Sequence, residues 1–466
     1  MSWKRQLSYV AVNRTWRHIA LPMVYNKAIV CCEPDYEAMG TETYMNGDLD
    51  TLDIPEKWIT NVDLMISNRM TRYAKEMYIT LSTDIGVLYY IDELFDRLQL
   101  DNADWASVAA MDFRIYNVTA DDDESHEKEA SELGIVFSQY FPSIKQLKCE
   151  AQRNDHLSTA FTNTLVSCYA NRLTKYETTF STPTSYPVFG QQLTHLEISR
   201  CSDAVKELIY IHASSIRYLA LGQLNFDYEL VNYKTSSSSQ LVFENLETWK
   251  LIYNEPVGIS FEQLQEYLSN QNRCKVVAPK LRHLSVYKYL TLFPLNFTTS
   301  TFKLRSLHMT CSTVAAQLFA KIKFPNLRDL YLTLFKDNSI EEEPDIVATV
   351  NTILDTTRPS NNCMILLHSS LAGINSKHMK WSRITRLSVS ESIPFEDMLK
   401  VLKGVPNATN LSFCRVNIGG AEALEFVKEH GVVDGAQQRC ILPLHSKAKT
   451  VDFGNEREYS SVLSIP

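Results

Sequence analysis

Three histidines that recur in one repeated motif are the first residues in this sequence to suggest chemistry. His195, His283 and His308 each lie beside the second leucine of a short apolar pattern, in LTHLEI, LRHLSV and LRSLHM. Imidazole rings that share a surface can ligate a metal, or they can contact a partner. No H-E-x-x-H or C-x-x-C pair accompanies them, and the motifs that carry them are mostly not consecutive. We therefore expect these histidines to contact a partner, and we expect no metal site.

Other motifs that mark catalytic or cofactor sites are missing from the sequence. There is no G-x-x-x-x-G-K-S/T phosphate loop and no G-x-S-x-G elbow. Gly419-Gly420 precedes a helical pattern and is typical of a turn, and Glu341–Glu343 precede a helix whose N-terminus carboxylates stabilise. We expect no catalytic residue, no cofactor and no enzymatic activity. An enzyme on an unrecognised α/β fold is the alternative that these absences leave open.

The composition of the chain argues against several classes of partner. Its 466 residues are 45% apolar and carry a formal net charge of −8, without a run of Lys and Arg. Nucleic-acid binding usually requires a basic stripe, and no apolar run reaches the length of about 18 residues that a membrane span needs. Ten cysteines without C-x-x-C spacing, and a polar N-terminus, indicate reduced thiols. We expect a protein of the cytoplasm that can also enter the nucleus. We expect it to bind neither nucleic acid nor membrane.

A repeated pattern explains where the three histidines lie. The sequence apolar-x-x-apolar-x-apolar recurs with several spacings of 23 or 24 residues, and copies start at Ile144, Leu173, Leu193, Ile216, Leu246, Leu281, Leu304, Leu327, Ile384, Ala408 and Ala448. In a strand, the fourth and sixth positions point toward one side and the third and fifth toward the other. Each copy therefore predicts a short strand with leucines in the core and polar residues outside.

Helical signals between the copies indicate a strand–loop–helix–loop unit. Helices are predicted at 60–68, 92–98, 127–137 and 345–354, and from Pro394 to Gly404, with further helices after Ser260 and over 420–429. Strands are predicted around Met77–Ile79, Met111–Phe113 and 363–367. One unit cannot bury its own apolar face, so neighbouring units must stack. The fold class is predicted to be α/β.

This arrangement resembles the leucine-rich repeat solenoid, which has parallel strands on a concave face and helices on a convex face. An ordinary α/β domain with a parallel sheet is the alternative. The third and fifth positions of the repeats predict a chemically mixed concave face that suits a protein partner. Its candidate residues are Lys175, His195, Glu197, Tyr218, Lys250, His283, His308, Asp329, Tyr331 and Arg386.

The stretch LSYVAVNRTWRHIALPMVYN, residues 7–26, resembles the C-terminal half of an F-box, the helical module that begins many leucine-rich repeat proteins. The matching positions are Leu7, Val10, Val12, Trp16, Ile19, Leu21, Pro22 and Tyr25. Asn13 stands where the family usually has cysteine, and the family's first helix is not matched. The layout is most similar to divergent F-box/leucine-rich repeat proteins of fungi. It predicts an F-box-like segment over 1–35, degenerate repeats over 36–140 and a repeat solenoid over 141–466.

The resemblance implies a function. An F-box binds the adaptor subunit of an SCF-type cullin–RING ubiquitin ligase, and the repeats then hold a target protein for ubiquitin-dependent degradation. We expect weak or conditional adaptor binding through residues 7–26, because the first helix supplies much of the family's contact. A repeat scaffold without a ligase link is the alternative function, and a plain amphipathic cap on the first repeat is the alternative for residues 7–26.

Overall fold

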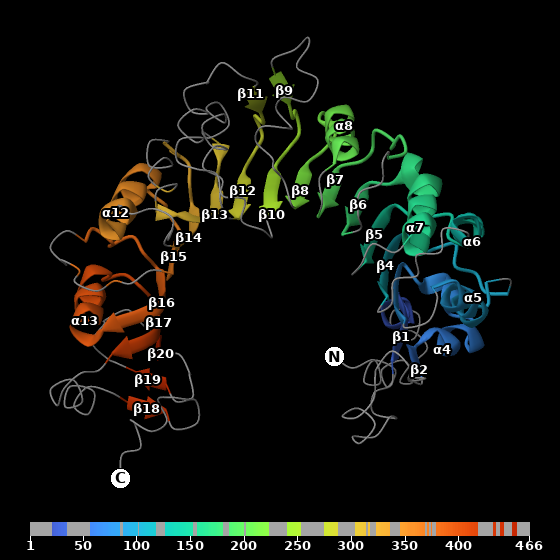
Figure 1. Cartoon of the computed structure of the whole chain (residues 1–466), viewed down its shortest axis with the longest axis horizontal. Coiled ribbons are helices and arrows are strands. Elements are labelled where there is room, and N and C mark those ends of the chain that lie inside the picture. Colours follow the sequence, from blue (N-terminus) through green and yellow to red (C-terminus); the bar gives the residue numbers. More distant parts are fainter. Residues whose placement is uncertain are drawn as a thin grey trace. The chain divides into compact units, whose positions relative to one another are not determined.

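The computed structural model forms two compact units, Met1–Gly222 (unit 1) and Gln223–Pro466 (unit 2) (Figure 1). The structure describes residues 21–34, 56–83, 87–100, 102–117, 126–151, 156–179, 186–199, 202–222, 240–252, 275–287, 303–313, 316, 323–335, 345–368, 371, 374, 379–417, 432–434, 439–441 and 450–453.

Unit 1 contains one sheet with the strand order β2-β1-β3-β4-β5-β6-β7-β8. The pairing of β1 with β2 is antiparallel, and the pairings from β1 through β8 are parallel. The strands are β1 (Lys27–Pro34), β2 (Glu56–Thr60), β3 (Glu76–Thr83), β4 (Ala110–Asn117), β5 (Gln146–Ala151), β6 (Lys175–Thr178), β7 (His195–Ile198) and β8 (Tyr218–Gly222).

The helices of unit 1 lie on one face of this sheet (Figure 1). They are α4 (Val62–Ser67), α5 (Val87–Leu98), α6 (Glu127–Tyr140), α7 (His156–Tyr169) and α8 (Asp203–His212). An aromatic core joins α6 and α7 to β4: the ring centroids of Phe113 and Phe161 are 5.3 Å apart, and those of Phe113 and Phe137 are 6.2 Å apart. Rings at these separations bury large apolar areas and fix the helices against the sheet. The helices predicted at 60–68, 92–98 and 127–137 are thus confirmed, with shifted ends.

Unit 2 contains a parallel sheet with the strand order β10-β12-β13-β14-β15-β16-β17-β20. A parallel pair, β9 and β11, and an antiparallel pair, β18 and β19, are separate from it. The strands are β9 (Gln240–Val242), β10 (Thr248–Ile252), β11 (Lys275–Val277), β12 (His283–Tyr287), β13 (Ser306–Ser312), β14 (Asp329–Phe335), β15 (Asn362–His368), β16 (Arg386–Pro394), β17 (Asn410–Asn417), β18 (Val432–Asp434), β19 (Arg439–Ile441) and β20 (Thr450–Phe453).

Two long helices of unit 2 fall within the described residues, α12 (Ile346–Thr357) and α13 (Phe395–Gly404). The side chain of Asp345 caps α12 by accepting a hydrogen bond from the backbone N–H of Val347 at 2.9 Å. The helix expected from Pro394 starts one residue later, because β16 continues through Ser392 to Pro394 after an irregularity in its register. The helices predicted after Ser260 and over 420–429 lie outside the described residues.

Proline turns lead into several of the strands. Residues 142–143, 279–280, 325–326 and 406–407 are turns. The N–H of Leu281 donates to the carbonyl of Ala278 at 3.1 Å, and the N–H of Leu327 donates to that of Phe324 at 3.2 Å. Proline favours the second position of such a turn, since its φ is already fixed there. The apolar residue before each proline is buried, so the turn also anchors the strand to the core.

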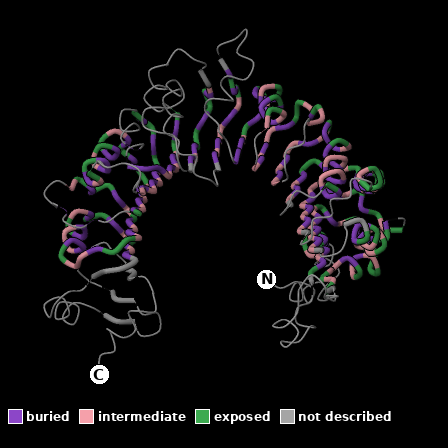
Figure 2. The backbone as a smooth tube through the Cα atoms, in the orientation of Figure 1, coloured by how far each residue is buried: buried purple, intermediate pink, exposed green. Residues whose placement is uncertain are grey.

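A column of buried side chains fixes the register of the strands in each unit. In unit 2, Leu284 pairs with Leu307 and Leu307 pairs with Leu330, while Trp249 pairs with Leu284 on the other side. These side chains are at most 4% exposed, and Figure 2 shows buried and half-buried positions alternating along the strands. In unit 1, the members of the column are Met77, Met111, Leu147, Tyr176, Leu196 and Leu219.

The repeats predict that Leu196, Leu219, Leu284, Leu307 and Leu330 stack in one buried column on neighbouring parallel strands. The stacking of Leu196 with Leu219 in unit 1, and of Leu284, Leu307 and Leu330 in unit 2, is confirmed, but the strands of Leu219 and Leu284 are not direct neighbours. The neighbour that precedes Leu284 is Trp249. The architecture is α/β, with a mostly parallel sheet and helices in each unit, and it is compatible with a solenoid. The sheet of unit 1 runs without interruption across the predicted domain boundary at residue 140, since β4 pairs with β5.

Candidate partner-binding surface

The sheet face that carries no helix in the described parts of each unit is here called the open face. Strand alternation sends the third and fifth repeat positions to it while the fourth and sixth enter the core. All ten residues of the expected partner face lie in strands, with exposed or half-buried side chains. Lys175, His195, Glu197 and Tyr218 lie together on neighbouring strands of unit 1, and the other six lie on unit 2.

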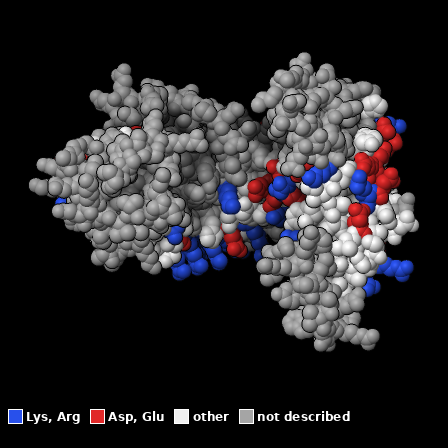
Figure 3. Space-filling view, turned by 90° about the horizontal axis from the view of Figure 1, so that it is seen from below, with Lys and Arg blue, Asp and Glu red and all other residues white. Residues whose placement is uncertain are grey.

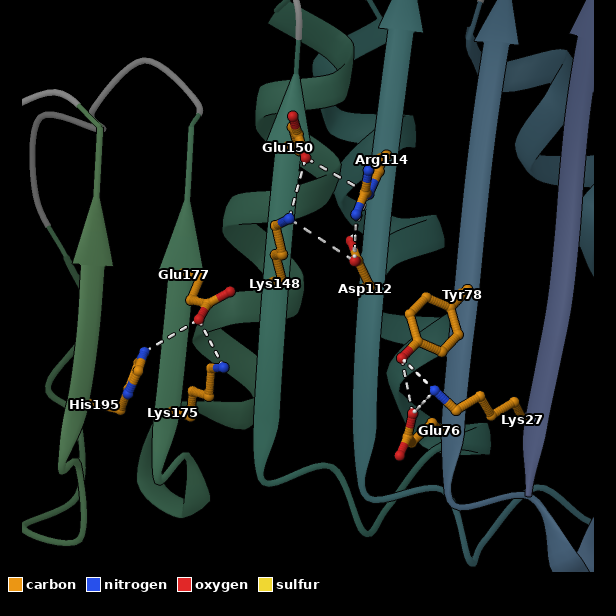
Figure 4. A network of polar contacts seen from close by, with 10 residues as sticks. All are labelled: Lys27, Glu76, Tyr78, Asp112, Arg114, Lys148, Glu150, Lys175, Glu177 and His195. Carbon is orange, nitrogen blue, oxygen red and sulfur yellow. Dashed lines mark hydrogen bonds and ion pairs between the residues drawn. The ribbon is translucent and has the colours of Figure 1, made fainter. Parts of the chain in front are cut away.

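Opposite charges on the open face of unit 1 pair with one another (Figure 4). Nζ of Lys27 lies 3.0 Å from Oε2 of Glu76, and the hydroxyl of Tyr78 donates to the same oxygen at 2.8 Å. The hydrogen bond from Tyr78, together with that from Lys27, lowers the pKa of Glu76 against the opposing effect of burial. Glu76 is therefore held in its ionised form by its two neighbours.

A second group on the same face contains two cations and two carboxylates from β4 and β5. Arg114 contacts Oδ2 of Asp112 at 2.8 Å and Oε2 of Glu150 at 3.6 Å, and Lys148 contacts Glu150 at 3.3 Å. The hydrogen bond to Asp112 raises the pKa of Arg114. The four charges balance, so this part of the face presents little net charge. Figure 3 shows Lys and Arg beside Asp and Glu over this part of unit 1.

A third group surrounds Glu177 on β6. Nζ of Lys175 lies 2.7 Å from Oε1 of Glu177, and Nε2 of His195 lies 3.1 Å from the same oxygen. The hydrogen bonds from His195 and then from Lys175 lower the pKa of Glu177 to about 2. The hydroxyl of Tyr218 donates to Glu197 at 3.2 Å, and its ring stacks on His195 with centroids 3.8 Å apart.

Glu177, His195 and Glu197 are the three residues in the described part of the chain whose ligand atoms lie close enough to hold a metal ion, within 4.8 Å of one another. This group differs from the three histidines that the sequence placed on one surface, His195, His283 and His308, since it shares only His195 with them. The donor set argues against a metal. An ion would have to displace the ammonium of Lys175 from Glu177, and the imidazole nitrogen that it needs already faces that carboxylate. The contacts favour an ion-pair network.

Among the described residues, the open face of unit 2 carries fewer charged side chains than that of unit 1. The rings of His308 and Tyr331 lie 5.7 Å apart on neighbouring strands. Burial, together with the charge of Lys250, lowers the pKa of His308, so this ring favours its neutral form. Oδ1 of Asp329 accepts a hydrogen bond from the side-chain amides of Asn361 and Asn362, each at 2.9 Å.

Sequence reasoning missed three arginines beside this face, Arg282, Arg305 and Arg328. They were detectable, because each occupies the second position of a repeat, in LRHLSV, LRSLHM and LRDLYL. The expected partner face included only the third and fifth positions of each repeat. The second position is also exposed at these three copies, because it lies just before the strand begins.

Part of the F-box-like stretch is described. Residues 21–24 form a helical turn, and the N–H of Tyr25 donates to the carbonyl of Leu21 at 3.0 Å. Leu21 and Tyr25 are buried and Pro22 is exposed, and the chain then enters β1. Outside the described residues lie Leu7, Val10, Val12, Trp16 and Ile19.

No protein-family model matches the chain, and no curated protein matches it. In the part of the chain that the structure describes, none of the helices combines the length and apolar character that a bilayer crossing requires.

Proposed function

We propose that this chain is a protein-interaction module of the leucine-rich repeat type, with the open face as its partner-binding surface. One observation carries the proposal. Each copy of the apolar repeat coincides with a strand, and the parallel register brings its third and fifth positions side by side on one face. Such a face offers many side chains of mixed chemistry at fixed spacing, which suits a protein surface more than a small ligand.

In this role the chain makes and breaks no bond itself. It raises the local concentration of one protein near another, and the effective concentration depends on the distance and the linkage between the two bound proteins. The proposed interaction module acts in the cytoplasm or the nucleus. The ion pairs on unit 1 support a preorganised surface, because paired side chains such as Glu177 and Lys175 need little further ordering when a partner binds.

Affinity capture from a cell extract with the whole chain, followed by mass spectrometry, tests this proposal. Tyr331→Ala changes the open face of unit 2, and Thr352→Ala is the matched control because Thr352 is exposed on α12. Truncation of an interface tyrosine costs about 1–2 kcal/mol or more, so recovery of a specific partner should fall about tenfold with Tyr331→Ala alone. Equal recovery with both variants would refute an open-face binding site in unit 2.

The more specific form of the proposal is a substrate receptor of an SCF-type cullin–RING ubiquitin ligase. Its support is the match of residues 7–26 to the F-box pattern ahead of the repeats. The burial of Leu21 and Tyr25 agrees with a packed helical end but fits a plain cap equally well. A repeat scaffold without a ligase link remains the alternative function.

Binding of the purified ligase adaptor to the whole chain separates these two functions. We expect a dissociation constant in the micromolar range, weakened about tenfold or more by Trp16→Ala. Met23→Ala is the control, because Met23 lies in the helical turn and its side chain is 74% exposed. Absence of adaptor binding, or equal effects of the two variants, would leave the scaffold function.

A further inference from the structure

Three exposed arginines form a row at the start of neighbouring strands in unit 2. Arg282, Arg305 and Arg328 each precede the first residue of β12, β13 and β14. The N–H of Arg305 donates to the carbonyl of Arg282 at 2.8 Å, and the N–H of Arg328 donates to that of Arg305 at 2.8 Å. Since neighbouring strands lie about 4.8 Å apart, the three side chains start from closely spaced points. These residues are called the arginine row.

Little negative charge in the described structure offsets the arginine row. Nη1 of Arg282 lies 3.9 Å from Oε2 of Glu247, with both side chains about half exposed, so water screens this pair. No carboxylate of the described residues lies within ion-pair distance of Arg305 or Arg328. Three like charges at this spacing repel one another, and among the described residues the Arg282–Glu247 pair is the one ion pair that offsets them.

The acid nearest in sequence forms no ion pair with the arginines of the row. Asp329 directly follows Arg328, yet its Oδ1 accepts hydrogen bonds from the amides of Asn361 and Asn362, each at 2.9 Å. Those bonds hold one oxygen of the carboxylate against the start of β15. The open face of unit 1 shows the opposite arrangement, because Arg114 there contacts two carboxylates.

We propose that the arginine row binds an extended acidic segment of the partner protein. The inference rests on the proposed function and adds the chemistry of the partner. Arginine matches a carboxylate with two parallel hydrogen bonds. Alternate residues of an extended chain are about 6.7 Å apart, and flexible arginine side chains that start about 4.8 Å apart reach carboxylates at that spacing.

An acidic protein segment fits better than a nucleic acid. The whole chain carries a formal net charge of −8 and has no run of Lys and Arg, so its overall field repels a long polyanion. A short acidic segment needs only local cations. The arginine row supplies three of them at one end of the open face, where a segment can bind while the rest of the partner contacts the strands.

Fluorescence anisotropy of the whole chain with a labelled peptide tests this proposal. The probe is a peptide of about twelve residues in which glutamate alternates with serine, measured at low salt because screening weakens such contacts. Arg305→Glu should weaken binding about tenfold or more, whereas Arg305→Lys should keep part of the affinity. Arg217→Glu is the matched control, because Arg217 is exposed at the second position of the IRYLAL repeat in unit 1, and it should change binding less than about twofold.

Two results would overturn the proposal. One is equal weakening by Arg305→Glu and Arg217→Glu, which would indicate non-specific attraction. The other is tighter, Arg305-dependent binding of a single-stranded DNA of equal charge, which would assign the row to nucleic acid. Arg328→Glu gives an independent second variant if Arg305→Glu fails to fold, as judged by circular dichroism. If Tyr331→Ala still lowers partner capture about tenfold while the peptide does not bind, the acidic segment is refuted and the proposed function stands.

Discussion

Leu307 gives the sharpest test of how the buried column holds unit 2 together. Its side chain is fully buried on β13, between Leu284 and Leu330 of the neighbouring strands. Leu307→Ala removes Cγ and both Cδ atoms, which costs about 0.8 kcal/mol of transfer free energy for each methyl or methylene group. The cavity that remains adds to this, because close-packed strands relax only in part. The expected loss is about 2–5 kcal/mol of unfolding free energy.

Hydrogen exchange followed by mass spectrometry measures this loss strand by strand. A loss of about 3 kcal/mol raises the rate of exchange through local opening more than about 100-fold. The effect should be largest in β12, β13 and β14, because a repeated unit contacts mainly its neighbours. Ser306→Ala is the control on the same strand, since Ser306 faces the open side, and it should change stability by less than about 0.5 kcal/mol.

Uniform loosening of the whole chain in Leu307→Ala would refute the reasoning. Exchange in β3 and β4 of unit 1 would then rise as much as in β13, and stability would belong to one cooperative body. Circular dichroism in urea complements the exchange data, but a chain of two units need not unfold in one step, so a single midpoint does not decide the question.

Two further predictions concern polar contacts. The pKa of Glu177 is lowered to about 2 by His195 and Lys175, so its ionised form stabilises the folded state above the ordinary carboxyl pKa of about 4.3, and this contribution fades as pH falls toward 2. Glu177→Gln should therefore lower the free energy of unfolding by about 1–3 kcal/mol near pH 6, after allowance for solvent screening, and by progressively less below pH 4. Urea titrations over this pH range measure the difference. A difference that does not change with pH would contradict the ion-pair network. Asp345→Ala removes the acceptor for the N–H of Val347 and should lower the stability of α12 by about 1 kcal/mol, measured by hydrogen exchange in that helix. Asp345→Asn should keep most of the stability. Equal losses in the two variants would argue against the cap.

The repeat pattern predicts the strands and their facing correctly, because both depend on local rules. Alternation along a strand requires only the order of residues, so Leu307 in the core and His308 on the open face follow from LRSLHM. Proline turns are equally local, and those before Leu281 and Leu327 form at an apolar-Pro-x sequence in each case. Helix ends are less certain, because propensity competes with packing: β16 continues to Pro394 and delays α13.

Contacts across the sheet could not be predicted from the repeats alone. Arg386 and Asp329 share the third position of their repeats, yet Arg386 pairs with Met364, whereas Asp329 pairs with Asn362. The register advances by two residues between β15 and β16. A shift of two preserves the facing of every side chain, so the hydrophobic pattern gives no signal of it, although it changes every polar neighbour.

The sequence by itself determined which residues form the strands, which side chains enter the core and that one face carries mixed polar residues. Those features depend on local periodicity, and every strand register of the same parity buries the same side chains. Only the tertiary structure decided that Glu177 lies between Lys175 and His195, that Trp249 precedes Leu284 in its column, and that the arginine row lies at the start of consecutive strands, where Arg305 and Arg328 have no carboxylate of the described residues within ion-pair distance. These features depend on which strands become neighbours and by how many residues they are offset, and that choice is made by the packing of distant segments.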